Sequence, residues 1–323
     1  FYKLPSGTSG IFRCSHLSDS IITLPYRPIK IHRTITDTIY DPKINEIKIT
    51  DEMGTVHFFK LLFSDISTSE WYLTKMISAD FTDTIKFEYE IPTEVHSFPQ
   101  RTQIYNESIV GGIPFGYTCS PSVDISYSLE YSGGSAHVNT PLLKKIESSN
   151  CVINFSYDER SDDFGGYLKL KRITNIAITS RGSSSIIKNF SFNHEYFGNS
   201  TDKNRRLCLE SFSIGSPGMP QTEKYSFKYY TTKVLPPYSY YSTTYSEDFW
   251  GYYNGSNSPN LIPADFVIDI NKYTCGNRDP DASNTFSRAC MLEEIKYPTG
   301  GKTVFQFERH FAPNVFSYKY PAN

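Results

Sequence analysis

The sequence lacks the features that several large classes of protein require. No apolar run approaches the roughly 20 residues that a membrane-spanning helix needs, so we expect no membrane span in this chain. Neither sign of charge forms a block, since 32 Lys and Arg residues are mixed with 34 Asp and Glu residues. Nucleic-acid binding needs clustered Lys and Arg, so we expect no nucleic-acid partner.

The motifs of common catalytic and cofactor sites are also missing. The 7 His residues are scattered without H-x-H or H-E-x-x-H spacing, and no two of the 6 Cys residues form a C-x-x-C pair. These absences disfavour zinc enzymes and structural zinc sites. There is no G-x-S-x-G nucleophile motif and no Gly-rich phosphate loop between a strand and a helix. We therefore expect a protein that is not an enzyme and holds no cofactor.

Helix-forming residues are scarce, whereas aromatic residues are abundant. Leu and Ala are few, and no segment keeps a 3.6-residue hydrophobic period over three turns. The chain has 25 Tyr and 23 Phe, and aromatic residues make up 15% of it. Tyr and Phe, together with Thr, Ile and Val, favour pleated and half-buried surfaces. The composition predicts an all-β protein with little helix.

A self-similar unit occurs six times along the chain. Each copy opens with an aliphatic residue, two polar residues and a hydrophobic residue, and closes with an alternating aromatic pair. Turn-forming residues lie between the two halves, so each copy predicts an antiparallel hairpin. The opening of the last copy, at Leu292, does not alternate cleanly, which predicts either a bulge or a twisted entry of the strand. The copies span residues 44–59, 73–89, 143–157, 170–192, 209–229 and 292–307.

Stacked hairpins of this size predict one extended or curled sheet. We assign residues 41–323 to this hairpin region and residues 1–40 to an N-terminal extension or edge strands. The chain opens at Phe1 and reads mid-pattern at both ends, so we expect it to be a fragment of a longer protein.

The hairpins resemble YD repeats, the tyrosine-rich unit of RHS-repeat proteins. The likeness is strongest to the region upstream of the repeats in large exported RHS-like proteins of Bacteroidetes, and it covers most of residues 40–310. It implies export, a place outside the cell or on the outer-membrane surface, and curled β-sheet walls. It rests on RRLCL (205–209), SEDFWGYYNG (246–255), IP (262–263), GNRDPD (276–281) and MLEEIKYPTGGKTVFQFE (291–308).

The chain departs from the RHS pattern in two respects. Its repeats are less compact than YD repeats, and it carries no self-cleaving core motif. Enclosure of a C-terminal toxin or other cargo, which RHS shells perform, is therefore kept as an alternative.

The run SEDFWGYYNG lies between the fifth and sixth units and admits two interpretations. As a ligand platform, it would use Tyr252 and Tyr253 for stacking on sugar rings and Glu247 or Asp248 for sugar hydroxyls.

As a structural plug, the same run would cover the end of the sheet with Phe249 and Trp250. The sequence favours the plug, with Trp250 mostly buried and any ligand contact left to the two Tyr residues. The neighbouring carboxylates of Glu247 and Asp248 point to opposite faces of a strand, so they do not form a catalytic pair.

Two further features of the sequence concern metal binding and a disulfide. Asp279 and Asp281 lie in an acidic loop and are calcium candidates, although an Arg within the loop favours a solvated turn and no metal. Cys275 and Cys290 bracket the same loop-like segment, which in an exported protein predicts a disulfide. The alternative is that these Cys residues are small buried apolar groups.

Three hypotheses for function remain open. The first is a non-enzymatic, exported cell-surface protein that acts in adhesion, glycan contact or scaffolding. Its partners would be glycans, other surface proteins and the rest of its own polypeptide. The second is a shell segment around a C-terminal toxin or cargo. The third is a glycan-active enzyme whose site carries no known motif.

Overall fold

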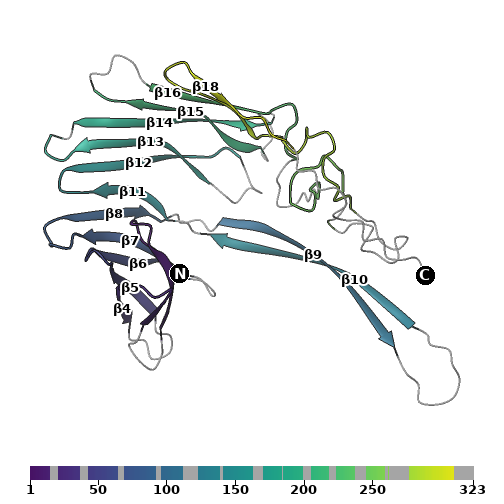
Figure 1. Cartoon of the computed structure of the whole chain (residues 1–323), viewed down its shortest axis with the longest axis horizontal. Helices are drawn as coiled ribbons and strands as arrows, with labels where there is room; N and C mark the ends of the chain where they lie inside the picture. The colour runs from purple at the N-terminus through teal and green to yellow at the C-terminus, as the bar shows by residue number, and fades with distance from the viewer. Residues whose placement is uncertain are drawn as a thin grey trace.

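The computed structural model is all-β, and the part of the chain that it describes contains no helix, as the composition predicted. One open antiparallel sheet of 13 strands dominates the molecule, beside a 3-stranded and a 2-stranded sheet (Figure 1). The described residues are 1–14, 21–36, 43–64, 69–91, 96–111, 123–138, 141–162, 170–183, 185–198, 205–217, 223–236, 245–258, 261 and 276–308.

The large sheet runs from β4 at one edge to β18 at the other, with sequence neighbours side by side. Its strands are β4 (Lys30–Thr36), β5 (Lys43–Thr50), β6 (Val56–Ser64), β7 (Ser69–Ile77), β8 (Thr84–Glu90), β11 (Leu142–Glu147), β12 (Cys151–Glu159), β13 (Lys171–Ser180), β14 (Ile186–Phe197), β15 (Arg206–Gly215), β16 (Glu223–Tyr229), β17 (Leu292–Lys296) and β18 (Lys302–Val304). The small sheets contain β1 (Tyr2–Lys3), β2 (Ser9–Cys14) and β3 (Ile21–Leu24), and β9 (His96–Gly111) and β10 (Val123–Val138).

Each repeated unit forms one hairpin of the large sheet, which confirms the prediction from the sequence. The turns close as expected: the amide of Gly54 donates to the carbonyl of Asp51, and that of Gly300 to Tyr297, both at 3.0 Å. Because neighbouring strands are antiparallel, all six turns lie at one rim and the links between units lie at the other. The hairpins are β5–β6, β7–β8, β11–β12, β13–β14, β15–β16 and β17–β18.

Every unit carries one bulge at its entry, which is one of the two alternatives that Leu292 predicted for the last copy. In β17, Leu292 pairs with Tyr229 and Glu294 pairs with the preceding residue of β16, so Glu293 is left out of the pairing. The added residue brings Leu292 and Ile295, three positions apart, to the same face of the sheet. The pattern of one hydrophobic, two polar and one hydrophobic residue is therefore the signature of a bulge. The entry bulges of the other units leave out Asn45, Thr74, Lys144, Thr174 and Glu210, and two further bulges, away from the entries, leave out Leu62 and Ile187.

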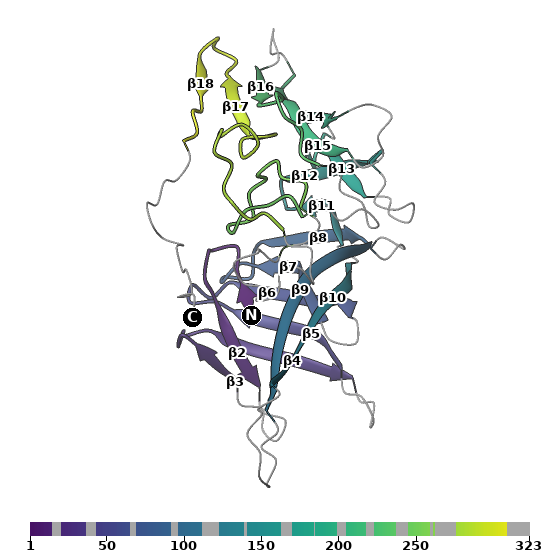
Figure 2. The same ribbon diagram turned by 90° about the vertical axis from the view of Figure 1, so that its right-hand side faces the viewer.

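The bulges also correct the predicted start of the fourth repeated unit and account for the curvature of the sheet. In the fourth unit, Ile173 is the residue that pairs across the bulge, so the unit opens at Ile173 and not at Leu170. Bulges bend strands and increase their twist. Six of them at one rim explain why the sheet in Figure 2 is curved rather than flat.

Tyr side chains connect the bulges of neighbouring strands. In three units, the Tyr that ends the unit donates its hydroxyl hydrogen bond to the carbonyl of the residue that opens it. Burial raises the pKa of each of these Tyr residues. The bonds run from Tyr89 to Leu73 (2.9 Å), from Tyr157 to Leu143 (2.8 Å) and from Tyr229 to Leu209 (2.7 Å).

The two faces of the large sheet differ in polarity. Opposed residues share a face, and one face carries apolar rows such as Phe87, Ile146 and Ile153. Phe212 stacks on Tyr225 of the next strand with ring centroids 5.1 Å apart. The other face carries charged groups that form ion pairs across strands. These pairs include Lys145–Glu88 (3.5 Å) and Lys302–Glu294 (2.8 Å).

The apolar face is fully covered at only one end within the described residues. There Tyr2 and Leu4, in and beside β1, bury Ile47 and Ile49 of β5. No hydrophobic residue of β8 or of β11 to β17 is buried in the described part of the chain. The core therefore lies at the N-terminal end, and the rest of this face is half-exposed.

Candidate functional site

The long link between β16 and β17 folds into a structure of its own at the bulge rim (Figures 1 and 2). Two of its described parts, residues 245–258 and 276–291, are held together by polar contacts. The side-chain amide of Asn254 donates to the carbonyls of Asn277 and Asp279, each at 3.0 Å. Arg278 forms an ion pair with Glu247 at 3.1 Å. These contacts give the link a defined shape.

The run SEDFWGYYNG forms a tight hairpin within this link. Glu247 and Tyr253 form an antiparallel bridge. Asp248 closes the turn, because its Oδ1 accepts the amides of Trp250 (2.9 Å) and Tyr252 (3.0 Å). Gly251, with φ 86, completes the turn in the left-handed region that favours glycine.

This turn presents its aromatic residues to solvent. Trp250 is 54% exposed, so the prediction that it is mostly buried was wrong. The reason is local: Trp250 is at the tip of a tight D-x-x-G turn, whose side chains face away from the strands. Phe249 is 39% exposed and lies beneath the guanidinium of Arg278, at 5.6 Å from its ring centre.

The two Gly residues of the run have different roles. A Cβ on Gly251 would meet nothing within 4 Å, so only its backbone angle requires glycine. A Cβ on Gly255 would approach the ring of Phe286 to 2.5 Å. Gly255 therefore allows Phe286 to pack closely against the chain, and Tyr253 meets the same ring edge to face at 5.5 Å.

A pocket of about 360 Å³ opens beside the turn. Its volume is within the roughly 300–1,000 Å³ of small-molecule sites. Trp250 and Tyr252, which is 56% exposed, contribute aromatic surface, and Asp248 is 4% exposed. The remaining lining comes from Pro280, Asp281, Asn284, Ser287 and Arg288, and from Met291, Phe307 and Glu308 beside β17 and β18.

Tyr253 and Glu247 do not line this pocket. Tyr253 packs on Phe286, and Glu247 pairs with Arg278. Of the predicted ligand residues, the structure therefore brings Asp248 and Tyr252 to the pocket, together with Trp250, which was assigned to the plug. Sequence reasoning missed Arg288 and Phe307; the position of Phe307 in an alternating aromatic pair predicted packing only.

Asp281 organises the second half of the pocket wall. Its carboxylate accepts hydrogen bonds from the amides of Ser283, Thr285, Phe286 and Ser287 and from the Ser283 hydroxyl. Burial acts to raise the pKa of Asp281, but these hydrogen bonds outweigh it and the pKa is lowered.

The proposed calcium ligands are not arranged for that role in the described residues. The carboxylate of Asp281 is occupied by its own turn, and Asp279 is exposed. No group of three or more His, Cys, Asp or Glu residues that could hold a metal occurs in the described ranges. The calcium candidates therefore gain no support.

Cys290 carries an unpaired thiol, and burial raises its pKa. Its suggested disulfide partner, Cys275, lies outside the described residues. The disulfide is therefore unsupported.

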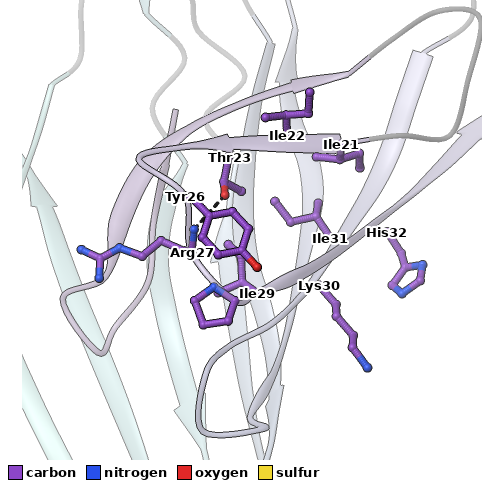
Figure 3. Close-up of a pocket in the computed structure, with 10 residues that line it drawn as sticks. Ile21, Ile22, Thr23, Tyr26, Arg27, Ile29, Lys30, Ile31 and His32 are labelled. Atoms are coloured by element: carbon purple, nitrogen blue, oxygen red, sulfur yellow. Dashed lines mark hydrogen bonds between the residues drawn. The ribbon is translucent and has the colours of Figure 1, made fainter.

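Two other pockets have structural explanations. One of about 440 Å³ is formed by a single segment, Ile21–His32, around the loop between β3 and β4 (Figure 3). The amide of Arg27 donates to the Thr23 hydroxyl across this loop at 3.1 Å, and the Tyr26 ring is 83% exposed. The other, of about 510 Å³, lies where β1 and β2 meet the large sheet and is lined by core residues such as Ile49. The pocket beside Trp250 is lined by three described segments, 248–252, 280–291 and 307–308.

No model of a known protein family matches the chain, and no curated protein has a significantly similar sequence. Within the described residues, no helix is long and apolar enough to cross a bilayer.

Proposed function

We propose that this chain is a non-enzymatic β-sheet scaffold of an exported cell-surface protein, and that it contacts glycans through the pocket beside Trp250. The observation that carries the proposal is the placement of Trp250 and Tyr252, each more than half exposed, on one pocket. Exposed aromatic rings facing a cavity offer stacking surfaces for the apolar faces of sugar rings.

The polar lining fits the same role. Asp248 accepts both of its described hydrogen bonds at Oδ1, and exposed Glu308 lies across the pocket. Carboxylates accept hydrogen bonds from sugar hydroxyls. A saccharide in this pocket would therefore meet both stacking and hydrogen-bonding groups. The location outside the cell and the RHS-like relationship belong to the proposal, supported by the repeated Tyr-closed hairpins.

A glycan-binding array tests the proposal directly. Wild-type protein should bind a restricted set of glycans, and Trp250→Ala should lose that binding. Phe249→Ala is the matched control, because Phe249 belongs to the same turn but does not line the pocket. An array without hits, or equal loss in both variants, would count against the pocket as the glycan site.

A wall segment of a larger enclosure is the second candidate function. It is favoured by the curved sheet whose apolar face is half-exposed over β8 and β11 to β17. Protease treatment of the full-length product is the test. An enclosed segment should survive digestion until the sheet is unfolded, and immediate cleavage would contradict enclosure.

A further inference from the structure

The pocket beside Trp250 has an unbalanced charge. Among the described residues, its lining contains three carboxylates, Asp248, Asp281 and Glu308, and one guanidinium, Arg288, which gives this described lining a formal charge of −2 (1 − 3). A neutral sugar does not require this excess of negative charge, and the excess would repel a sugar acid.

Arg288, the one positive group of the described lining, contacts other parts of the wall. The guanidinium of Arg288 lies 4.8 Å from the ring centre of Tyr230, and its Nε donates to the carbonyl of Asn284. Tyr230 in turn donates to the carbonyl of Phe305 at 3.0 Å. Arg288 therefore serves as a fixed part of the wall that joins the link to the sheet.

The carboxylates divide into two roles. Asp281 accepts five hydrogen bonds from its own turn, so it contributes negative potential rather than a contact. Asp248 is 4% exposed and lines the pocket, and among the described residues both of its hydrogen bonds reach Oδ1. Its Oδ2 receives none from the described part of the chain, so this oxygen can accept a hydrogen bond from a ligand.

Aromatic rings in the same pocket also favour a positively charged ligand. Trp250, Tyr252 and Phe307 line the same pocket as the carboxylates. A cation over an aromatic face is attracted by the negative face of the ring, most strongly over Trp. Carboxylates and aromatic rings around one cavity form a chemical environment that suits an ammonium group better than a hydroxyl.

We propose that the pocket selects an amino sugar with an unacetylated, protonated amine. This inference rests on the proposed glycan contact and narrows it to one ligand class. The ammonium group would lie against Asp248 while the sugar ring stacks on Trp250 or Tyr252.

Calorimetric titration with three oligosaccharides of equal length tests the inference: oligomers of glucosamine, of N-acetylglucosamine and of glucose. At about pH 6 the sugar amine is protonated, and we expect the glucosamine oligomer to bind about tenfold more tightly or better. Added salt should weaken this binding, because it screens the charges.

Two variants assign the preference to the pocket. Asp248→Asn keeps the acceptor for the turn but removes the charge, and Glu308→Gln removes an exposed charge outside the turn. Both should reduce the preference for the glucosamine oligomer. Glu247→Gln is the matched control, since this neighbouring carboxylate does not line the pocket. Melting temperatures would confirm that each variant is folded.

The outcomes separate the two proposals. Equal binding of charged and neutral oligomers would overturn the amino-sugar inference and leave glycan contact intact. Absence of binding by all three oligomers would overturn both. Tight binding of an oligolysine peptide with no saccharide binding would also overturn both, because it would show a pocket for cationic peptides.

Discussion

The hydroxyl of Tyr157 donates a 2.8 Å hydrogen bond to the carbonyl oxygen of Leu143, which opens the same repeated unit. The bond crosses between β12 and β11 and ends at a bulge, where the regular ladder is interrupted. The Tyr that gives the repeat its sequence signature thus satisfies a backbone group that the bulge would otherwise leave unbonded. Two other units contain the same bond.

Replacing Tyr157 with Phe should lower the free energy of unfolding by about 0.5–1.5 kcal/mol, because the Leu143 carbonyl loses its donor. Denaturant unfolding of both proteins measures the change. Tyr26→Phe is the control, since this ring is 83% exposed and its hydroxyl is in solvent. Equal effects at the two positions would show that the Tyr157 bond contributes nothing specific.

Gly255→Ala should destabilise the link that forms the pocket. The added Cβ would lie 2.5 Å from the Phe286 ring, and the backbone angle of φ 71 already disfavours alanine. Overpacking of this kind costs about 1–3 kcal/mol. Gly300→Ala is the matched control, because its φ of 86 imposes similar strain with nothing within 4 Å. Thermal melts should show a larger loss for Gly255→Ala, and a larger loss for Gly300→Ala would argue against the packing described.

Asp281 should make the stability of the link depend on pH. Its pKa is lowered in the folded protein, so it contributes stability above the unfolded value of 3.8 that is lost as pH falls through the folded pKa. Asp281→Asn should cost about 1–3 kcal/mol near neutral pH, because the amide group replaces one of the two carboxylate oxygens and the donors bonded to that oxygen lose their acceptor.

The difference between wild type and Asp281→Asn should shrink in acid, as unfolding at a series of pH values would show. Asp279→Asn, an exposed neighbour, should leave the profile unchanged. A constant difference down to the lowest pH would mean that ionisation of Asp281 does not stabilise the turn.

The hairpin sheet could be predicted from the sequence because its signals are local. Alternation, turn residues and the spacing at Leu292 are each contained in a few consecutive residues. The exposure of Trp250 is also encoded locally, because residues 248–251 repeat the D-x-x-G pattern of residues 51–54. Asp51 closes a D-x-x-G turn with the same hydrogen bonds as Asp248, and Met53, at the position equivalent to Trp250, is 81% exposed.

The set of residues that lines the pocket could not be predicted from local signals of this kind. Trp250, Arg288 and Phe307 come from segments that are separated in sequence and meet only after the link folds onto the sheet. Each of these side chains, considered singly in the sequence, is equally compatible with a structural role. Only the tertiary arrangement distinguishes a pocket wall from core packing.

The fluorescence of Trp250 tests the central claim most directly. The sequence has 2 Trp residues, and Trp71, which donates to the Ile44 carbonyl, is in the core region. A Trp71→Phe protein therefore carries a single indole beside the pocket, and a Trp250→Phe protein is its counterpart. Titration with the glucosamine oligomer should shift the emission of the first protein to saturation and leave the second unchanged. Unchanged Trp250 emission at concentrations where calorimetry shows binding would contradict the account.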